Sequence, residues 1–386
     1  MTTKTGTQLL YEMIAESKNY GDIIHMGRGD LDLDTPAHII AALGASMAEH
    51  ANSYSPPEGI LPLREAIAAR VKRVNSISVD PATEVVVTNG GQEALFLMVL
   101  TAVGPQEALL VPEPNYNSYN DALHFAQGLK VGVPTFVAED FRVDPARMRQ
   151  AISDQTRAML LASPNNPTGA VISPTDMKEL VTLAERHDLM ILADEIYDLF
   201  LYDGHQHLSP ASLPDGRDRT LTLNAFSKAY AMTGWRLGWI TGPADLMAHV
   251  KKLKAALTGA ASIATQYAGL AALTGPQHVV ADMHATYIRR REIVRNALMR
   301  LEVPYGESQG GQFLFADISF TGMGSIRVSQ KILSDQHVLV YPGGAFAPGC
   351  DDYLRITFLQ PEEKLREGME RIGKVLQVIR QNTGHS

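Results

Sequence analysis

The chain has 386 residues, 45% of them hydrophobic and 20% charged, a composition that excludes wholesale disorder and a collagen-like repeat. Its 34 Lys and Arg residues against 42 Asp and Glu residues give a net charge of −8, which argues against a surface that binds nucleic acid. The single cysteine, Cys350, excludes an internal disulfide and a cysteine-rich zinc site, and it fits the reducing cytoplasm in which we expect the protein to work.

No segment of the sequence is expected to enter a membrane. Residues 1–20 are polar and lack the apolar core of a secretory signal. Residues 255–281 contain no Asp, Glu, Lys or Arg, but they are rich in Ala, Gly, Thr, Ser and Gln and include a proline. They lack the block of Leu, Ile and Val that fills the ~20 residues of a membrane span. We therefore expect a helix and a connection buried in protein.

Short apolar runs alternate with helix-like stretches through the middle of the chain. Helices are predicted at 92–103 and 174–187. The predicted strands lie at residues 84–88, 108–111, 157–162, 189–193, 220–223 and 237–241. Continuous apolar runs with helices between them predict an α/β fold with a mostly parallel sheet covered on both faces.

The C-terminal part has a different pattern. Residues 281–301 predict one extended helix that leads out of the sheet, and residues 312–318 and 353–358 alternate like half-buried strands. This pattern indicates a smaller α+β domain that the N-terminal segment joins. We expect a large domain at 40–283 and a small domain formed by 1–39 and 284–386.

The residues that follow the predicted strands indicate the site, because ligands of open α/β sheets bind beyond the carboxyl ends of the strands. One of them begins a helix, whose start can bind a phosphate. The others supply an aromatic ring, an amide, a carboxylate, a phenol, a hydroxyl, an amine and a guanidinium. In chain order they are Gly91, Gln92, Tyr116, Asn166, Asp194, Tyr197, Ser227, Lys228 and Arg236.

This set of groups matches the cofactor pyridoxal phosphate (PLP), which needs an amine for a Schiff base and a carboxylate that keeps its ring nitrogen protonated. We expect Lys228 to be the Schiff-base nucleophile, its amine activated by nearby positive charge and partial desolvation. Asp194 is the expected partner of the pyridinium. The amides of Gly91 and Gln92, at the start of a helix, would bind the phosphate together with Arg236.

Three stretches carry a resemblance to a known family: Ser-Pro-Asn-Asn-Pro-Thr-Gly at 163–169, Asp-Glu-Ile-Tyr at 194–197 and Phe-Ser-Lys-Ala-Tyr-Ala-Met-Thr-Gly-Trp-Arg-Leu-Gly at 226–238. They resemble the class I/II aminotransferases of PLP fold type I, similar to the aspartate, alanine and aromatic enzymes. The likeness extends over about residues 27–358. It implies ping-pong transamination: an amino acid leaves its amine on the cofactor as pyridoxamine phosphate and departs as a 2-oxo acid, and a second 2-oxo acid takes the amine.

The resemblance also implies a role for each residue near the cofactor. Lys228 would form the internal aldimine and then move the proton between the substrate Cα and the C4′ atom of the cofactor. Asp194 would pair with the ring nitrogen, Tyr197 and Asn166 would hydrogen-bond the ring oxygen, and Tyr116 would stack on the ring.

On the substrate side, Arg355 resembles the arginine that grips the α-carboxylate with a bidentate fork, with Asn166 beside it, and Gly29 resembles the glycine that lies over that carboxylate. From its residues alone, Arg355 could also be the partner in a structural ion pair, although we expect the functional role. Tyr54 resembles the tyrosine that reaches the phosphate of the partner subunit, which implies a symmetric homodimer with shared active sites.

The sequence departs from the family pattern at several positions. Ala225 replaces a frequent serine, so Ser227 and the backbone remain as contacts for the phosphate. Leu31 stands where proline is usual and Asp30 where glutamate is common, both near the expected substrate mouth. Cys350 replaces a frequent glycine, and we assign it no role.

Alternatives remain open at this point: a C–S β-lyase on the same scaffold, or a non-catalytic PLP-binding domain. The Gly-x-Ser-x-Gly sequence around Ser308 resembles the elbow of serine hydrolases, but that elbow needs a strand before it and a helix after it, so we predict an ordinary loop. His205 and His207 could indicate a metal, but we expect a surface position in a polar loop without a third ligand. Nothing in the sequence specifies the substrate side chain.

Overall fold

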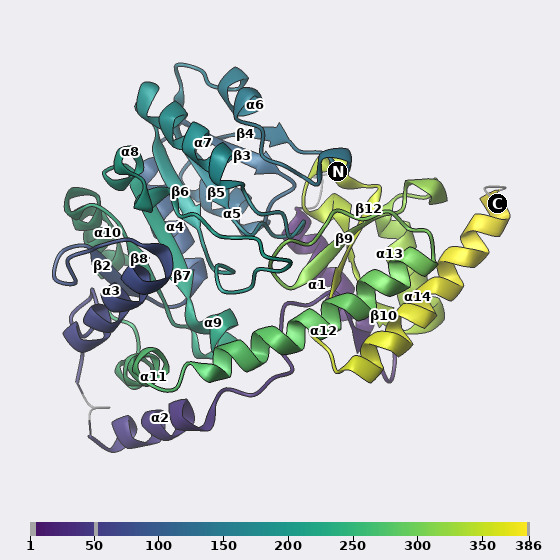
Figure 1. Cartoon of the computed structure of the whole chain (residues 1–386), viewed down its shortest axis with the longest axis horizontal. Coiled ribbons are helices and arrows are strands. Elements are labelled where there is room, and N and C mark those ends of the chain that lie inside the picture. Colours follow the sequence, from purple (N-terminus) through teal and green to yellow (C-terminus); the bar gives the residue numbers. More distant parts are fainter. Residues whose placement is uncertain (1–4, 50–52, 384–386) are drawn as a thin grey trace.

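The computed structural model describes residues 5–49 and 53–383, so both ends of the predicted small domain and residues 50–52 lie outside the described part. Within the described part, seven strands form the central sheet in the order β2-β8-β7-β6-β5-β3-β4 (Figure 1). Their bounds are β2 Val85–Thr88, β3 Ala108–Glu113, β4 Leu129–Pro134, β5 Thr156–Ala162, β6 Met190–Asp194, β7 Thr220–Ala225 and β8 Gly238–Thr241.

The sheet confirms the prediction of a mostly parallel α/β fold. Strands β4, β3, β5, β6 and β7 pair in parallel, and only β8 runs antiparallel, to both β7 and β2, among the described strands. Strands β3, β5, β6 and β7 lie inside the sheet and are buried along nearly their whole length. Their continuous apolar runs are therefore a consequence of burial on both faces.

One strand of the central sheet was missing from the prediction. Strand β4 pairs with β3 at the edge of the sheet, and five of its six residues are exposed or half-buried. Since an edge strand needs no continuous apolar run, its Lys-Val-Gly-Val-Pro sequence carries no strand signal of the kind that the inner strands have.

Helices cover both faces of the sheet. Apolar side chains of α4 (Gly91–Ala102), α5 (Ser118–Phe125) and α10 (Ala244–Leu257) pack on one face. Those of α3 (Leu61–Asn75), α7 (Pro174–Arg186) and α11 (Ile263–Thr274) pack on the other. Helix α2 (Ala37–Glu49) lies against α11 at the lower left of Figure 1. The remaining short helices of this part are α6 Pro145–Gln150, α8 Pro214–Arg217 and α9 Phe226–Ala229.

No helix in the described ranges is long and apolar enough to cross a membrane. The uncharged stretch at 255–281 forms the end of α10, all of α11 and the start of the next helix, so the predicted helix and connection are confirmed. The burial expected for the whole stretch was wrong, since residues 255–258 and 276–278 are exposed. Small residues such as Ala268 and Ala272 let α11 pack closely against the sheet.

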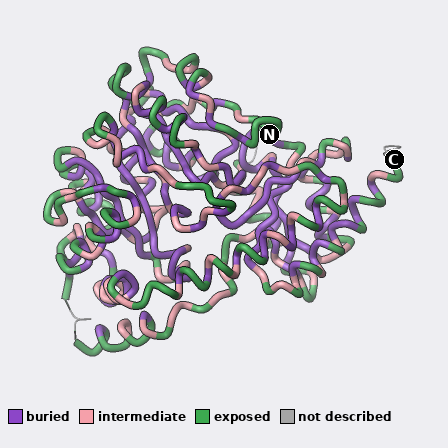
Figure 2. The backbone as a smooth tube through the Cα atoms, in the orientation of Figure 1, coloured by how far each residue is buried: buried purple, intermediate pink, exposed green. Residues whose placement is uncertain are grey.

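The C-terminal part begins with α12 (His278–Arg300), which runs from the sheet layer to a second core (Figure 1). There, β11 (Tyr341–Pro342), β12 (Tyr353–Thr357) and β9 (Phe313–Asp317) form an antiparallel sheet against α12, α13 (Ser325–Gln336) and α14 (Glu362–Thr383). The prediction of half-buried strands was wrong in detail, since β9 and β12 are buried on both faces apart from one end residue each (Figure 2).

The N-terminal segment lies against this second core, as predicted. Its helix α1 (Gly6–Ser17) packs beside it, and β1 (Ile24–His25) pairs in parallel with β10 (Val338–Leu339). The expected domain limits at 39/40 and 283/284 fall inside the continuous helices α2 and α12. The division into two domains stays a prediction.

Candidate active site

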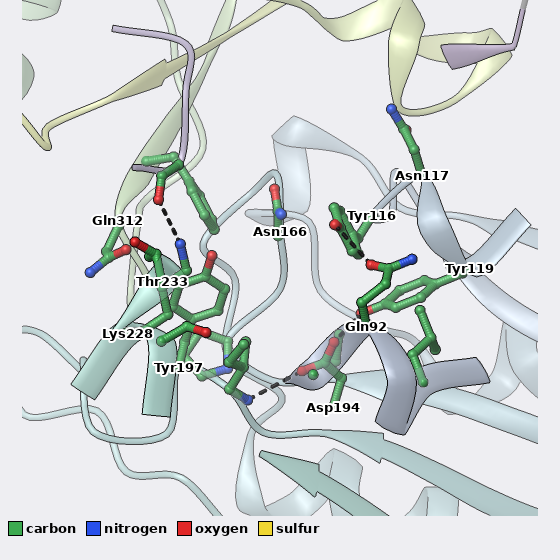
Figure 3. A pocket seen from close by; sticks show the side chains of 18 of the residues that line it. Gln92, Tyr116, Asn117, Tyr119, Asn166, Asp194, Tyr197, Lys228, Thr233 and Gln312 are labelled. Atoms are coloured by element: carbon green, nitrogen blue, oxygen red, sulfur yellow. Dashed lines mark hydrogen bonds between the residues drawn. The ribbon is translucent and has the colours of Figure 1, made fainter. Parts of the chain in front are cut away.

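A cavity of about 390 Å³ opens at the carboxyl ends of the central strands, a size typical of small-molecule sites. Eleven of the twelve residues selected from the sequence line it, and Figure 3 shows several of them converging on one space. They are Gly29, Gly91, Gln92, Tyr116, Asn166, Asp194, Tyr197, Ser227, Lys228, Arg236 and Arg355. The twelfth, Tyr54, is fully exposed and does not line the cavity of its own chain.

Asp194 ends strand β6 and lies at the floor of the cavity. Its Oδ2 accepts a hydrogen bond of 2.7 Å from the Tyr119 hydroxyl, and its Oδ1 accepts one of 3.2 Å from the backbone N–H of Ile196. Burial raises the pKa of the Asp194 carboxyl, and these two hydrogen bonds oppose the rise. A cation beside the carboxylate would therefore be bound strongly.

Tyr119 was missed in the sequence. It lies in the first turn of α5, three residues after Tyr116, which precedes the helix. Their rings meet edge to face with centroids 5.7 Å apart, and the Tyr116 hydroxyl donates to Oε1 of Gln92 at 3.3 Å. The spacing was the one signal available, but the contact with Asp194 depends on how α5 packs beside β6.

Lys228 lies in α9, directly after β7, and its Nζ donates a 2.7 Å hydrogen bond to the carbonyl of Gly29 from the N-terminal segment. A Cβ at Gly29 would lie 3.3 Å from that amine, so glycine permits the close approach. Burial, then the charge of Arg355, lower the pKa of the Lys228 amine to about 8. At physiological pH, the fraction of the Lys228 amine in the neutral, nucleophilic form is therefore larger than for an ordinary lysine.

The start of α4 and Arg236 form an anion site at the other end of the cavity. Gly90 precedes the helix with a φ of +85°, and a Cβ there would lie 2.6 Å from Nη2 of Arg236. Arg236 has a φ of +55° itself, a conformation uncommon for a residue with a side chain. Glycine is therefore required for the guanidinium to lie against the first turn of α4, where the N–H groups favour a phosphate.

Ser227 lines the cavity beside this anion site, whereas Ala225, where the family often has serine, ends β7 and is buried. The hydroxyl at 227 is therefore available to an anion while position 225 supplies none. Of the other two departures, Asp30 lines the cavity, but Leu31 packs against the C-terminal core, so its expected place at the substrate mouth was wrong.

Arg355, on β12, is 6% exposed and has no carboxylate partner among the described residues. Its Nη1 donates to Oδ1 of Asn166 at 2.8 Å, its Nη2 donates to the carbonyl of Gly27 at 2.6 Å, and its Nε is buried without a partner. Tyr341, Phe313 and Phe346 surround the guanidinium, with ring centroids 4.9–5.6 Å from its Cζ. The structural ion pair considered above is therefore not formed.

The aromatic wall around Arg355 could not be predicted from the sequence, because its members come from separate strands and turns. Tyr197, at the end of the same wall, packs edge to face on Phe313, and burial raises the pKa of its phenol. The cavity residues that the sequence analysis did not select are Leu10, Leu95, Asn117, Tyr119, Ala162, Pro164, Ile196, Leu223, Thr233, Gln312, Phe313, Tyr341, Phe346 and Leu359.

Two other sequence features are placed outside the cavity. Ser308 is fully buried in a loop that precedes β9, and its hydroxyl points to the carbonyl of Gly310, so it is no hydrolase nucleophile, as predicted. The surface position expected for His207 was wrong: its side chain is 5% exposed and lies 3.3 Å from Glu195. His205 is exposed as expected, and no group of three potential metal ligands exists among the residues that the structure describes.

The side chains of the cavity fit PLP. Lys228, the one lysine among the described lining residues, has a lowered pKa, a buried carboxylate lies on the floor, and an anion site lies at one end. A further cation, Arg355 of β12, lines the same cavity and has no carboxylate partner among the described residues.

Comparisons with known proteins agree with this geometry. The family model for aminotransferase class I and II matches residues 21–372. An aromatic-amino-acid aminotransferase 2 of Thermococcus litoralis is 37% identical over 92% of each chain, and an aspartate aminotransferase of Pyrococcus abyssi is 36% identical over 95% of this chain and 94% of its own length.

Two solved structures show the same fold over nearly the whole chain. An aromatic aminotransferase from Pyrococcus horikoshii superimposes with a TM-score of 0.90 at 35% identity and covers 95% of this chain and 99% of that one. An aspartate aminotransferase of Thermus thermophilus with maleate gives 0.90 at 33% identity and 97% of both chains. The chain therefore belongs to the class I and II aminotransferases, fold type I enzymes that use PLP to transfer amino groups between amino acids and 2-oxo acids.

Proposed function

We propose that each of the selected residues of the cavity has the role in transamination that its position suggests. The observation that carries the proposal is that the Lys228 amine, the Asp194 carboxylate and the Arg355 guanidinium all line one cavity. Asp194 would hold the protonated ring nitrogen, and the first turn of α4, Ser227 and Arg236 would hold the phosphate. Bound PLP supplies an electron sink for the pair of electrons released when the Cα–H bond of the substrate breaks.

Lys228 would then be the base that takes the proton from the substrate Cα and holds it on its amine. Its lowered pKa suits this role, since a catalytic base works best when its pKa lies near the operating pH. Tyr197 and Asn166 would hydrogen-bond the ring oxygen, and Tyr116 would stack on the ring. Tyr197 stays protonated, because burial raises its pKa, and so remains a donor.

Arg355 would bind the α-carboxylate of the substrate and orient the Cα–H bond for the lysine. Its Nη1 already donates to Asn166, which places the amide at the same carboxylate, and Gly29 lies over Lys228 on the same side. The relatives named above act on aspartate or on aromatic amino acids, so both classes are the first substrates to compare.

The Lys228→Ala substitution tests the proposal. We expect the variant to retain PLP through its phosphate and ring contacts but to lose turnover by roughly 10²–10⁴-fold, the usual contribution of general acid–base catalysis. The measurement is an absorbance titration with L-amino acids, aspartate and phenylalanine among them, that follows pyridoxamine phosphate and the matching 2-oxo acid. Lys178→Ala, on the exposed side of α7, is the control. Turnover equal to that of the control would exclude the role given to Lys228.

We also propose a homodimer in which Tyr54 reaches the phosphate of the other subunit. Large apolar side chains of α2, the segment after it and the start of α3 are exposed, namely Ile40, Met47, Tyr54 and Leu61. Burial of this patch against a second copy would explain their exposure.

The Tyr54→Phe variant should raise the Kd for PLP roughly two- to tenfold, the effect of one hydrogen bond, without changing the dimer mass measured by light scattering. Tyr11→Phe, on the exposed side of α1, is the matched control. An unchanged Kd, or a monomer for the unsubstituted chain, would contradict this proposal.

A cytoplasmic location is proposed on the chemistry of the one thiol. Cys350 is buried, burial raises the pKa of its thiol to about 12, and no second cysteine exists to pair with it. The natural location is tested by cell fractionation.

A further inference from the structure

A cluster of charged side chains lies beneath the active site, on the opposite side of the turn that carries Asp194 and Tyr197. In this turn, Glu195 and Asp198 alternate with the two site residues and are only 2% and 4% exposed. They point away from the cavity, which neither of them lines. The same turn that presents Asp194 and Tyr197 to the cavity therefore presents the carboxylates of Glu195 and Asp198 to the protein interior.

Asp198 has a full partner in this cluster. Its Oδ1 accepts from Nη2 of Arg70, on α3, at 2.7 Å, and its Oδ2 accepts from Asn75 at 3.0 Å. The Arg70 guanidinium lies 5.4 Å from the ring centroid of Trp239. Burial alone would raise the pKa of Asp198, but the guanidinium outweighs burial and lowers it. Arg70 and Asp198 thus form a balanced ion pair.

Glu195 lacks such a guanidinium. Its Oε2 accepts a hydrogen bond from the neutral amide of Asn75 at 2.8 Å. The same oxygen lies 3.3 Å from Nε2 of His207, which is within ion-pair distance, although the imidazole ring is not aligned for a hydrogen bond. Its Oε1 is buried and has no partner among the described residues. Its backbone carbonyl accepts from the side chain of Asn224 at 2.7 Å, on the strand that leads to Lys228.

The charge count of the cluster decides the state of His207. Two carboxylates face one guanidinium, and the titratable groups that act on His207 are Glu195, Asp198 and Arg70. Burial alone lowers the pKa of His207, but the Glu195 carboxylate outweighs burial and raises it. An unpaired buried carboxylate is expensive, and with both carboxylates ionised an imidazolium at 207 makes the cluster neutral.

We propose that His207 is a positioning residue for the active site: as an imidazolium beside Glu195, it neutralises the buried cluster that supports the Asp194–Tyr197 turn. Glu195 is the chain neighbour of Asp194, and its negative charge raises the pKa of the Asp194 carboxyl. The imidazolium offsets that charge, so Asp194 can stay ionised to hold a cofactor cation. The part of this proposal that concerns PLP rests on the role given to Asp194 above, while the charge balance itself does not.

The first experiment measures the Kd for PLP at pH 8 in His207→Gln. We expect a rise of roughly tenfold, because loss of the imidazolium leaves the buried Glu195 carboxylate uncompensated beneath the turn that holds Asp194. The double variant E195Q/H207Q should return to within about twofold of the unsubstituted enzyme, because both charges are then removed together. A histidine needed only for packing predicts no such rescue. His205→Gln, two residues away and exposed, should bind PLP normally.

The second experiment follows the unfolding of the apoprotein against pH. A group whose folded pKa is raised stabilises fully below its unfolded pKa of about 6.5 and loses that contribution as the pH rises through the folded value. The unsubstituted chain and His205→Gln should therefore lose stability across this window above pH 6.5. Glu195→Gln should not show this loss, because it lacks the charge that raises the pKa of His207.

The outcomes separate clearly. Normal PLP binding by His207→Gln, no rescue in the double variant, or an unchanged pH slope in Glu195→Gln would overturn the proposal. Should His207→Gln fail to fold, the pH slope of Glu195→Gln decides alone. Failure of the unsubstituted chain to bind PLP would contradict the proposed function instead, and the apoprotein measurement would still test the charge balance.

Discussion

Two of the buried arginines, Arg70 and Arg355, show how the same type of side chain serves opposite purposes in this fold. Both are nearly inaccessible to solvent, at 2% and 6% exposure. Burial lowers the pKa of each guanidinium, but Asp198 reverses this for Arg70, whose pKa is raised, while that of Arg355 stays lowered. Arg70 is satisfied by the folded chain, whereas Arg355 is held among rings and neutral oxygens and is available to an anionic ligand.

This difference teaches that an unpaired buried charge identifies a binding site better than a buried charge alone. Keeping Arg355 without a carboxylate costs stability, which a structural role would not tolerate. The same reasoning distinguishes Lys228, the one lysine of the cavity, whose pKa is lowered, from Lys254, which is fully buried but paired with Glu93 at 2.9 Å.

The largest effect should come from Arg355→Gln. Loss of the charge pair with the substrate carboxylate should lower kcat/KM by roughly 10²–10³-fold, since breaking a buried ion pair costs about 3–5 kcal/mol. The free energy of unfolding should stay the same or rise, because an uncompensated charge is removed. Steady-state kinetics and denaturant unfolding on one preparation would show both effects. A strongly destabilised protein would mean that Arg355 is structural after all.

Arg70→Met should give the opposite pattern. It leaves Asp198 buried without its cation and should reduce the free energy of unfolding by about 3–5 kcal/mol. At a temperature where the variant remains folded, kcat/KM should fall far less than in Arg355→Gln. If Arg70→Met unfolds like the unsubstituted chain, the contrast between the two arginines is lost.

The smallest effect concerns the Lys228 amine. The apoprotein should capture PLP faster as the pH rises through about 8, since only the neutral amine attacks the aldehyde. Because the charge of Arg355 contributes to the lowered pKa, the midpoint should move to higher pH in Arg355→Gln. Stopped-flow absorbance between pH 6.5 and 10 measures both midpoints. An identical midpoint in the two proteins would show that the arginine does not act on the lysine.

Much of the site was predictable from local sequence. Gly91, Gln92, Asn166, Asp194 and Lys228 each follow a buried strand directly, and parallel strands end at one edge of a sheet. The apolar runs that predict the strands thus also bring these side chains together, without any knowledge of distances.

Other parts were not predictable, for physical reasons that differ from one residue to the next. Strand β4 lacks an apolar run because it lies at an exposed edge. Tyr119 reaches Asp194 only through the packing of α5. His207 reads as part of a polar loop, since nothing near it in the chain indicates that Glu195 lies 3.3 Å away in the fold.

The sequence by itself determined the α/β class, the order of the inner strands along the chain and the reactive groups at their ends. These features could be predicted because burial and chain connectivity are local properties of a strand and the turn after it. Only the tertiary structure decided which charges are paired. Arg70 and Asp198 lie far apart in the chain and meet at 2.7 Å, whereas Arg355 meets rings and neutral oxygens. The energy of a buried charge depends on its nearest partners in space, and these are set by how distant elements pack.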